Sequence, residues 1–413
     1  MRDWEAEGTV HPKLSPSRAS RRGLDWFTFF VADLQTGFGP FLSIYLTTQK
    51  WTQVDIGLIL SIGSVASLLG QVPGGWIVDA VRSKRCVAAC AVVGIGISAL
   101  LIAVAPLLVT IIAAKLLHVG ASSILGPAIA AITLGLVGHK AIGPRLGRNA
   151  RFAAIGNGSA AAIMGAFGYF ISAQAVFYVT AALAIPTLLA LSGIREEDVD
   201  PVRADGGILA SNSQHGARGL GKLLRRPALL IFTTCVLLFH VANGALLPLV
   251  GSALTMRSSE WATALVAACI IVPQLIVALL SPTVGQLANS WGRRPLLLIG
   301  FGALPLRAAL LAWTNDPSLI VTVQMLDGIS AAALGVLVPL ALADISRGTG
   351  HFNLTQGIVG CATGIGAALS TTSAGYLADK FGTATAFFGL TVAGACGFLL
   401  LLSIMPETKP ADD

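Results

Sequence analysis

Long apolar runs separated by short polar segments dominate the chain. A run of about 20 apolar residues is long enough to cross a bilayer as a helix. Twelve such runs predict an all-α integral membrane protein with twelve transmembrane helices. We place these helices at residues 24–48, 54–79, 86–105, 107–137, 149–172, 174–193, 228–253, 262–288, 295–314, 318–345, 353–378 and 383–405.

The longest polar segment, residues 194–227, divides the apolar runs six and six. It predicts a cytoplasmic linker that is flexible in its middle and whose final "KLLRRP" lies along the membrane surface. The expected organisation is a cytoplasmic tail (1–23), a six-helix bundle (24–193), the linker (194–227), a second six-helix bundle (228–405) and a cytoplasmic tail (406–413). The first 23 residues carry no apolar segment with a cleavage site, so we expect no signal peptide.

Composition agrees with a membrane protein. Hydrophobic residues make up 54% of the chain, charged residues only 11%, and the mean hydropathy is +0.78, whereas soluble domains carry about 25% charged residues. The net charge is +7, but the basic residues occur in short clusters between apolar runs. That arrangement indicates membrane topology and not a nucleic-acid partner.

The basic residues also predict orientation. With the N-terminus in the cytoplasm, 22 of the 27 Lys and Arg lie on the cytoplasmic side, and only Lys50, Arg257 and Lys380 lie on the other. Lys115 and Arg307 fall inside apolar runs. The positive-inside rule therefore predicts cytoplasmic N- and C-termini and an even number of crossings, in a plasma membrane and most simply a bacterial inner membrane. We expect a monomer.

Enzyme chemistry has no support in the sequence. The six cysteines nearly all fall inside apolar runs without ligand spacing and are interpreted as packing residues. The sequence has no HExxH, GxSxG or Walker motif. We therefore expect no catalytic site, no metal and no cofactor.

The two halves are related in sequence. "FVADLQTGFGPFL" aligns with "FHVANGALLPLV", "GGWIVDAVRSKR" with "VGQLANSWGRRP", and "LLHVGASSILG" with "MLDGISAAALG". The three offsets are 208, 210 and 209 residues, which indicates an internal repeat. We expect the halves to superpose about a pseudo-twofold axis along the membrane normal, with His118 and Asp327 in equivalent places.

With these features, nearly the whole chain resembles a major facilitator superfamily transporter. The loop between the second and third predicted helices is similar to the superfamily signature of GxxxD followed by basic residues, here Gly75, Asp79, Arg82, Lys84 and Arg85. Its repeat copy has Gly285, Asn289, Arg293 and Arg294. The resemblance implies that these residues form a cytoplasmic gating loop. We expect Asp79 and the basic cluster to form a latch that stabilises one access state.

Helix ten resembles the RxxqG pattern of proton-coupled drug antiporters, with Gln324, Asp327 and Gly328 at the three marked positions. Helix four fits less closely, with Lys115 and His118. The superfamily resemblance implies that helices one, four, seven and ten line a central cavity. Lys115 and His118 share one helix face, and so do Gln324 and Asp327.

An ionisable side chain at mid-membrane depth costs about 2.5–3.5 kcal/mol, so it must face protein or a water-filled cavity. We expect Arg307 and Asp327, at similar depth, to pair. Each of these groups is either a cavity residue or a buried strut between helices, and the sequence leaves both readings open. The candidates for a substrate and proton cavity are Asp33, Gln35, Lys115, His118, His240, Asn243, Arg307, Gln324 and Asp327.

These features predict a secondary transporter that moves a small organic solute by alternating access in the lipid bilayer. The leading hypothesis is proton-coupled efflux, with Asp33 and Asp327 as proton acceptors. One alternative is proton-coupled uptake of an organic anion through Lys115 and Arg307. Another is a membrane sensor that no longer transports.

Overall fold

The computed structural model describes residues 16–36, 40–207, 223, 225–257, 262–314 and 316–410. Most of the predicted N-terminal tail and the middle of the predicted linker lie outside these residues. Within them every regular element is a helix. This result confirms the predicted all-α class.

The first half contains five membrane-scale segments, of which α5 is long enough for two crossings. They are α1 (Arg18–Thr36) with α2 (Pro40–Thr48), α3 (Gln53–Ala80), α4 (Lys84–Val104), α5 (Leu108–Phe170) and α6 (Ala175–Ser192). The described part of the linker holds a 3-10 turn, Glu196–Asp198, and α7 (Pro201–Ala204). The second half holds α9 (Pro227–Asn243), α10 (Leu246–Arg257), α11 (Ala262–Trp291), α12 (Arg294–Trp313), α13 (Pro317–Val323), α14 (Met325–Ile345), α15 (Phe352–Phe381) and α16 (Thr383–Ile404).

Helix α5 merges two predicted helices. Its 63 residues would reach about 95 Å as one straight rod, far more than a bilayer. The chain instead turns at Gly138, whose backbone has a φ of 69° and a ψ of 176°. The polar loop expected at residues 138–148 is therefore wrong. The second helix starts directly after Gly138, because Arg145 and Arg148 of that segment bind Asp25 of α1.

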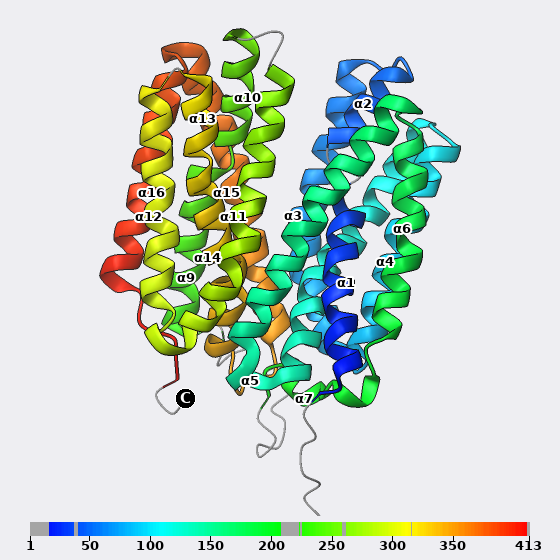
Figure 1. Ribbon diagram of the computed structural model, residues 1–413, viewed down its shortest axis with the longest axis vertical. Helices are drawn as coiled ribbons and strands as arrows, with labels where there is room; N and C mark the ends of the chain where they lie inside the picture. The colour runs from blue at the N-terminus through cyan, green and yellow to red at the C-terminus, as the bar shows by residue number, and fades with distance from the viewer. Residues whose placement is uncertain are drawn as a thin grey trace, which may run out of the picture.

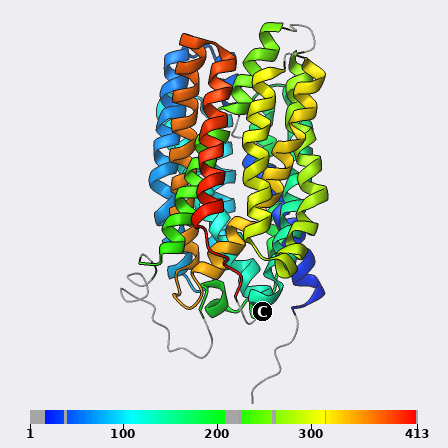
Figure 2. The ribbon, with the colours of Figure 1, turned by 90° about the vertical axis from the view of Figure 1, so that its left-hand side faces the viewer.

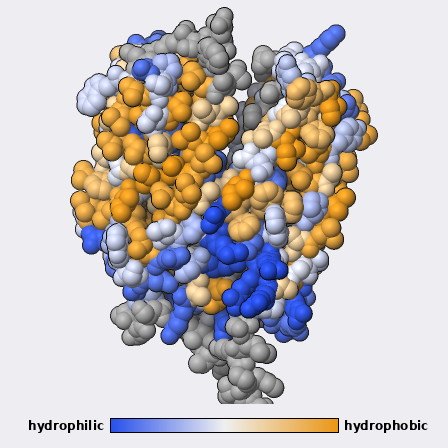
Figure 3. Space-filling model, in the orientation of Figure 1, coloured by the Kyte–Doolittle hydropathy of each residue, from blue (hydrophilic) through white to orange (hydrophobic). Residues whose placement is uncertain are grey.

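Several helices are suited to crossing a membrane. Nine helical stretches of the described chain are long and apolar enough, with α5 counted once. Large apolar side chains such as Leu69, Leu189 and Leu279 are 72%, 67% and 68% exposed, and Figure 3 shows a broad apolar belt on the face in view. The protein is thus a multi-pass integral membrane protein. The exact number of twelve crossings stays a prediction.

The helices stand side by side in two bundles (Figures 1 and 2). One large buried apolar cluster is built mainly from α9–α16, around residues such as Phe232 and Phe301. A second is built from α1–α6, around Phe27 and Phe177. The start of α1 and the end of α16 lie toward the same end of the molecule (Figure 1), which we call the terminal end; the opposite end is called the far end.

The two halves touch most closely at the terminal end, where α3 meets α15 and α5 meets α11. Glycines make this approach possible. A Cβ atom on Gly75 would lie 2.3 Å from the carbonyl oxygen of Asn353, and one on Gly285 would lie 2.3 Å from that of Gly143. At the far end the halves separate and leave a notch in the surface (Figure 3). The terminal end is therefore closed in this conformation.

Candidate functional site

Asp79 joins the two halves at the terminal end. Its Oδ1 accepts hydrogen bonds from the backbone N–H of Asn353 at 3.1 Å and from the Asn353 side-chain Nδ2 at 2.8 Å, and its Oδ2 accepts one from the N–H of Leu354 at 2.8 Å. Asn353 and Leu354 belong to the first turn of α15, whose N–H groups have no partner within their own helix. Asp79 thus caps a helix of the other half, where the partial positive charge of the helix end favours a carboxylate.

The expected latch therefore has a different partner. No salt bridge within 4.0 Å joins Asp79 to a basic side chain in the described chain. Lys84 instead binds the C-terminal end of its neighbour α3, with Nζ donating to the carbonyl oxygens of Val78 at 2.6 Å and Val81 at 2.8 Å. Lys84 Nζ also pairs with Asp205 at 2.6 Å. Lys84 thus binds the end of its neighbour α3, whereas the carboxylate of Asp79 binds the start of α15.

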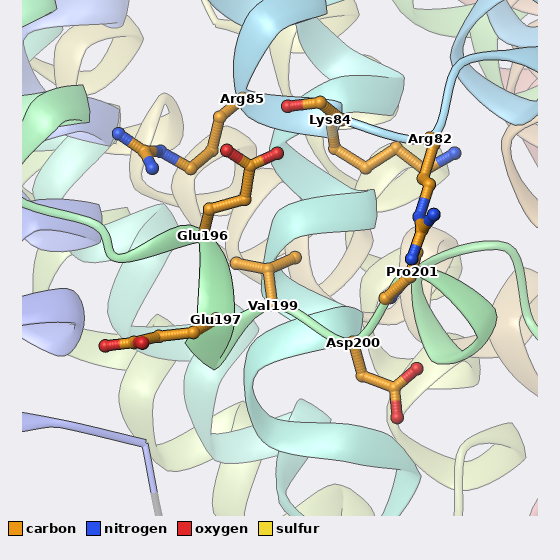
Figure 4. A pocket seen from close by; sticks show the side chains of 9 residues that line it. Arg82, Lys84, Arg85, Glu196, Glu197, Val199, Asp200 and Pro201 are labelled. Atoms are coloured by element: carbon orange, nitrogen blue, oxygen red, sulfur yellow. The ribbon is translucent and has the colours of Figure 1, made fainter.

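Arg82 follows the end of α3, and Arg85 lies in the first turn of α4. Arg82 is exposed and Arg85 is half-buried. With Lys84 they line a cavity of about 540 Å³ whose other wall is the linker, including Glu196 and Asp200 (Figure 4). This cavity contains basic and acidic groups in similar number, as expected for a loop held against its linker.

The repeat copy reproduces half of this arrangement. Arg293 NH1 donates to the carbonyl of Ala288 at the end of α11 at 2.9 Å, and its Nε donates to Asp344 at 2.8 Å. Asn289, at the position of Asp79, donates from Nδ2 to the carbonyl of Lys140 at 3.4 Å. Of these two equivalent positions, Asp79 provides a charged cap between the halves, whereas the copy has the neutral Asn289.

Arg294 has a separate role from Arg293. Its NH2 donates to the carbonyl of Leu402 at 2.6 Å, and its backbone N–H donates to Glu407 at 3.0 Å. The backbone N–H of Arg293 donates to the same carboxylate at 2.9 Å. The basic pair of the repeat copy thus attaches the chain end after α16 to the start of α12.

The linker supplies the carboxylate that pairs with Lys84. Lys84 resembles Arg293 in its contacts, because each binds a carbonyl oxygen at the end of the preceding helix, and the partner of Arg293 is Asp344 on α14. By the 209-residue offset between α5 and α14, the position that corresponds to Asp344 is Gly135, which has no side chain. A Cβ there would lie 2.8 Å from a methyl of Val199 and 3.0 Å from the carbonyl oxygen of Asp200. The linker occupies this space and brings Asp205 to Lys84.

The same linker segment also contacts the second half. The carbonyl of Asp205 accepts from the N–H of Phe352 at 3.2 Å, and the carbonyl of Gly206 accepts from the N–H of Gly348 at 2.7 Å. Asn353 Nδ2 donates to the carbonyl of Ala204 at 3.3 Å. We call residues 196–207 the strap. In the closed conformation the strap bonds to both halves.

Four of the predicted cavity residues form one cluster in the second half. Arg307 is 2% exposed. Its NH1 donates to Asp327 at 2.5 Å and to Asn243 Oδ1 at 3.0 Å, and its NH2 donates to Gln324 at 2.5 Å. The expected Arg307–Asp327 pair is thus present. The side chain of Asp327 keeps 28% exposure, so this cluster is reachable from outside the core.

The predicted residues of the first half do not form a matching ion pair. Asp33 is 2% exposed, and its Oδ1 has no hydrogen-bond partner among the described residues. Lys115 lies along α3 at Gly63, where a Cβ would meet its Cε at 2.4 Å, and no salt bridge within 4.0 Å joins it to a described carboxylate. His118 is buried, with Nε2 3.4 Å from the hydroxyl of Ser122.

A cavity of about 280 Å³ lies between the halves. Of the nine predicted cavity residues only Gln35 lines it, together with residues of α1, α5, α14 and α15. His240 instead packs on α15, where a Cβ on Gly366 would lie 2.9 Å from its Cβ. The polar lining residues Asn149, Asn157 and Gln356 are not among the residues predicted from the sequence. The eight-residue spacing of the two asparagines, which places them on one helix face, was the available signal.

Comparison with known proteins identifies the family. The family model "Major Facilitator Superfamily" matches residues 26–304 and 242–413. The chain belongs to the major facilitator superfamily. It is therefore a transmembrane transporter of small molecules and not an enzyme. Among curated relatives, an uncharacterized MFS-type transporter from each of two strains of Mycobacterium tuberculosis is 39% identical over 399 residues, which is 96% of this chain and 95% of the relative.

Solved structures of other members share the fold of this transporter. The human organic anion transporter MFSD10 (TETRAN) superposes with a TM-score of 0.71 at 15% identity, covering 93% of this chain and all of that one. The transporter FucP, solved in the outward conformation, superposes with a TM-score of 0.74 at 13% identity, covering 93% of this chain and 97% of that one. At such identities the likeness extends to the fold alone.

Proposed function

We propose that this transporter couples the movement of a small organic solute to protons, and that it works as an efflux carrier. The observation that carries the proposal is Asp33. A carboxylate that is 2% exposed and has an oxygen without a partner is costly in its charged form inside a membrane protein. Binding a proton removes that cost, and a conformation that admits water restores the charge. Asp33 can therefore load a proton in one access state and release it in the other.

Asp327 is the second proton acceptor of the proposal. Its salt bridge to Arg307 forms at the edge of the cluster, where the Asp327 side chain is 28% exposed. A proton on Asp327 would free the buried guanidinium of Arg307 to bind another acceptor, such as an oxygen of the solute. Proton and solute would then compete for one cluster, which is the relation that an exchanger needs.

The conformation supports alternating access as the transport cycle. The positive-inside pattern favours a cytoplasmic terminal end; with that orientation, the closed terminal end and the notch at the far end would correspond to an outward-facing state. To face inward the protein must break the Asp79 cap and the strap bonds. The direction of net transport is proposed from the antiporter-like pattern at Gln324 and Asp327.

The test uses purified protein in proteoliposomes. A panel of organic cations, anions and neutral solutes is first screened for compounds that raise the unfolding midpoint, and a radiolabelled hit is then the probe. Wild type should accumulate the probe against its gradient when a pH gradient is imposed. Asp33→Asn should lose that accumulation and retain exchange of probe across the membrane. The matched control is Asp55→Asn, a partly exposed carboxylate at the start of α3 that accepts a hydrogen bond from Thr52. Undiminished accumulation by Asp33→Asn would show that Asp33 is structural.

A second candidate function, proton-coupled uptake of an organic anion, has one observation in its favour. Lys115 is a half-buried cation without a carboxylate partner within 4.0 Å in the described chain, so it is available to an anionic solute. This function predicts that the stabilising hits are anions and that Lys115→Gln weakens their binding at least tenfold. Efflux of a cation or neutral solute predicts that Lys115→Gln leaves binding within about twofold.

A further inference from the structure

A basic cavity lies between α1 and the second part of α5, at the terminal end and apart from the space between the halves. Its volume is about 550 Å³. Five arginines and one aspartate are among its lining residues: Arg18, Arg21, Arg22, Asp25, Arg145 and Arg148. The lining therefore carries a net charge of +4. The transport cycle and the gating loop use none of these arginines.

The single carboxylate of this basic cavity is already occupied. Asp25 accepts from Arg145 NH2 at 2.7 Å and from Arg148 NH2 at 2.7 Å. Arg18, Arg21 and Arg22 are exposed and have no salt bridge within 4.0 Å in the described part of the chain. The start of α1 is already capped by Asp198 of the strap, so the excess positive charge of the cavity is that of the arginine side chains. Within the described residues the cavity therefore has an excess of cationic groups, which suits it to an anion.

An aromatic cluster adjoins the arginines on the side of the membrane centre. Trp26, one helical turn after Arg22, is 50% exposed and contacts Phe29, Phe30 and Phe152 at ring-centroid distances of 5.6, 6.0 and 6.1 Å. Arg148 lies over the Phe152 ring at 5.5 Å. Exposed tryptophans of membrane proteins lie at the level of the lipid headgroups. Figure 3 shows a strongly hydrophilic patch in this region, directly below the apolar belt.

We propose that this basic cavity binds the phosphate headgroup of an anionic phospholipid in the leaflet at the terminal end. The arginines bind the phosphate oxygens, for which the planar guanidinium is well suited. The aromatic cluster contacts the upper part of the acyl chains. A free phosphate would use only the first of these features, so the neighbouring exposed aromatic surface favours a lipid. Basic pockets beside membrane helices are suited to such headgroups.

The experiment measures lipid binding to full-length protein in neutral detergent, by native mass spectrometry with phosphatidylglycerol, phosphatidylcholine of the same chains, and glycerol 3-phosphate as probes. The test variant is Arg18→Gln with Arg22→Gln. The control variant is Arg82→Gln with Arg225→Gln, which removes two exposed charges of the same end away from the cavity. At about 1 kcal/mol for each basic residue near anionic lipid, the test variant should bind phosphatidylglycerol about 30-fold more weakly.

Three results would support the site together. Wild type should bind phosphatidylglycerol in preference to phosphatidylcholine, the test variant should lose that preference, and the control variant should keep it. Equal losses in both variants would show diffuse attraction and overturn the proposal. Competition by millimolar glycerol 3-phosphate at the same strength as the lipid would assign the cavity to a free phosphate instead. Unchanged unfolding midpoints without lipid verify that both variants are folded.

Discussion

Removal of the Asp79 carboxylate should open the terminal end. Asp79→Ala deletes an acceptor of three hydrogen bonds, two of them from backbone N–H groups in the first turn of α15. Loss of a helix cap costs about 0.5–2 kcal/mol, and a hydrogen bond to a charged group is worth about 1.5–3 kcal/mol. Allowing for water that replaces these bonds, we expect the closed conformation to lose about 2–4 kcal/mol.

That loss acts on one conformation only. When the halves separate, Asp79 and the start of α15 are each hydrated, so the substitution leaves the open state nearly unchanged. At 1.4 kcal/mol for each factor of ten, the ratio of closed to open molecules should fall about 30- to 700-fold. Asp79→Asn keeps one acceptor oxygen and loses the charge, as Asn289 does in the repeat copy. Its effect should lie between those of wild type and Asp79→Ala.

The assay is electron–electron double resonance between spin labels on the two halves at the terminal end. Arg82 and Ser290 are exposed and lie on different halves, and cysteines there can be labelled in a background without the native cysteines. Wild type should give a short distance and Asp79→Ala a longer one. The matched control is Asp198→Ala, because the three hydrogen bonds of Asp198 stay within the first half and its strap. An unchanged distance distribution in Asp79→Ala, or an equal shift in the control, would refute the reasoning.

Three further outcomes are expected. Gly75→Ala places a methyl group 2.3 Å from a carbonyl oxygen of α15 and should open the terminal end in the same assay, whereas Gly57→Ala, with nothing within 4 Å, should not. Arg307→Gln leaves Asp327 without its cation and should lower the free energy of unfolding by about 2–4 kcal/mol. The loss is smaller than for a fully buried pair because the Asp327 side chain is 28% exposed. Thermal unfolding measures this loss, and the additional substitution Asp327→Asn should restore part of it. Burial alone would raise the pKa of Asp198, but hydrogen bonds from two serines at the start of α1 lower it below its usual value. The ionised Asp198 therefore stabilises the folded state above its unfolded-state pKa, and this stabilisation is lost as the pH falls through the lower folded-state pKa. Hydrogen exchange at the start of α1 should increase below about pH 4. Asp198→Asn should show the same increase at neutral pH.

Apolar run length predicted the membrane helices well, because each crossing must satisfy its backbone within one helix. It failed at residues 138–148, where charge suggested a loop. Arg145 and Arg148 are accommodated in a helix because Asp25, more than a hundred residues earlier, lies beside them. Such a long-range partner leaves no local mark in the sequence.

The contacts of the polar residues were also predicted only in part. Depth along two neighbouring helices was enough to predict the Arg307–Asp327 pair. The partner of Asp79 was mispredicted, because the sequence shows nearby basic residues but not the helix end that the fold brings to it. Most of the cavity lining was not predicted, because Asn149 and Gln356 are neutral and do not stand out in an apolar run as an ionisable residue does.

The pairing of Lys84 with Asp205 determines where the chain can be divided. The strap follows the last helix of the first half, yet it supplies that half with an internal counter-ion in the place left by Gly135. For expression as two separate fragments, a break after Gly207 keeps the strap with its cation and should allow the fragments to reassemble. A break before Glu196 leaves the buried Lys84 without its counter-ion Asp205 until the other fragment binds, and reassembly should then depend on fragment concentration.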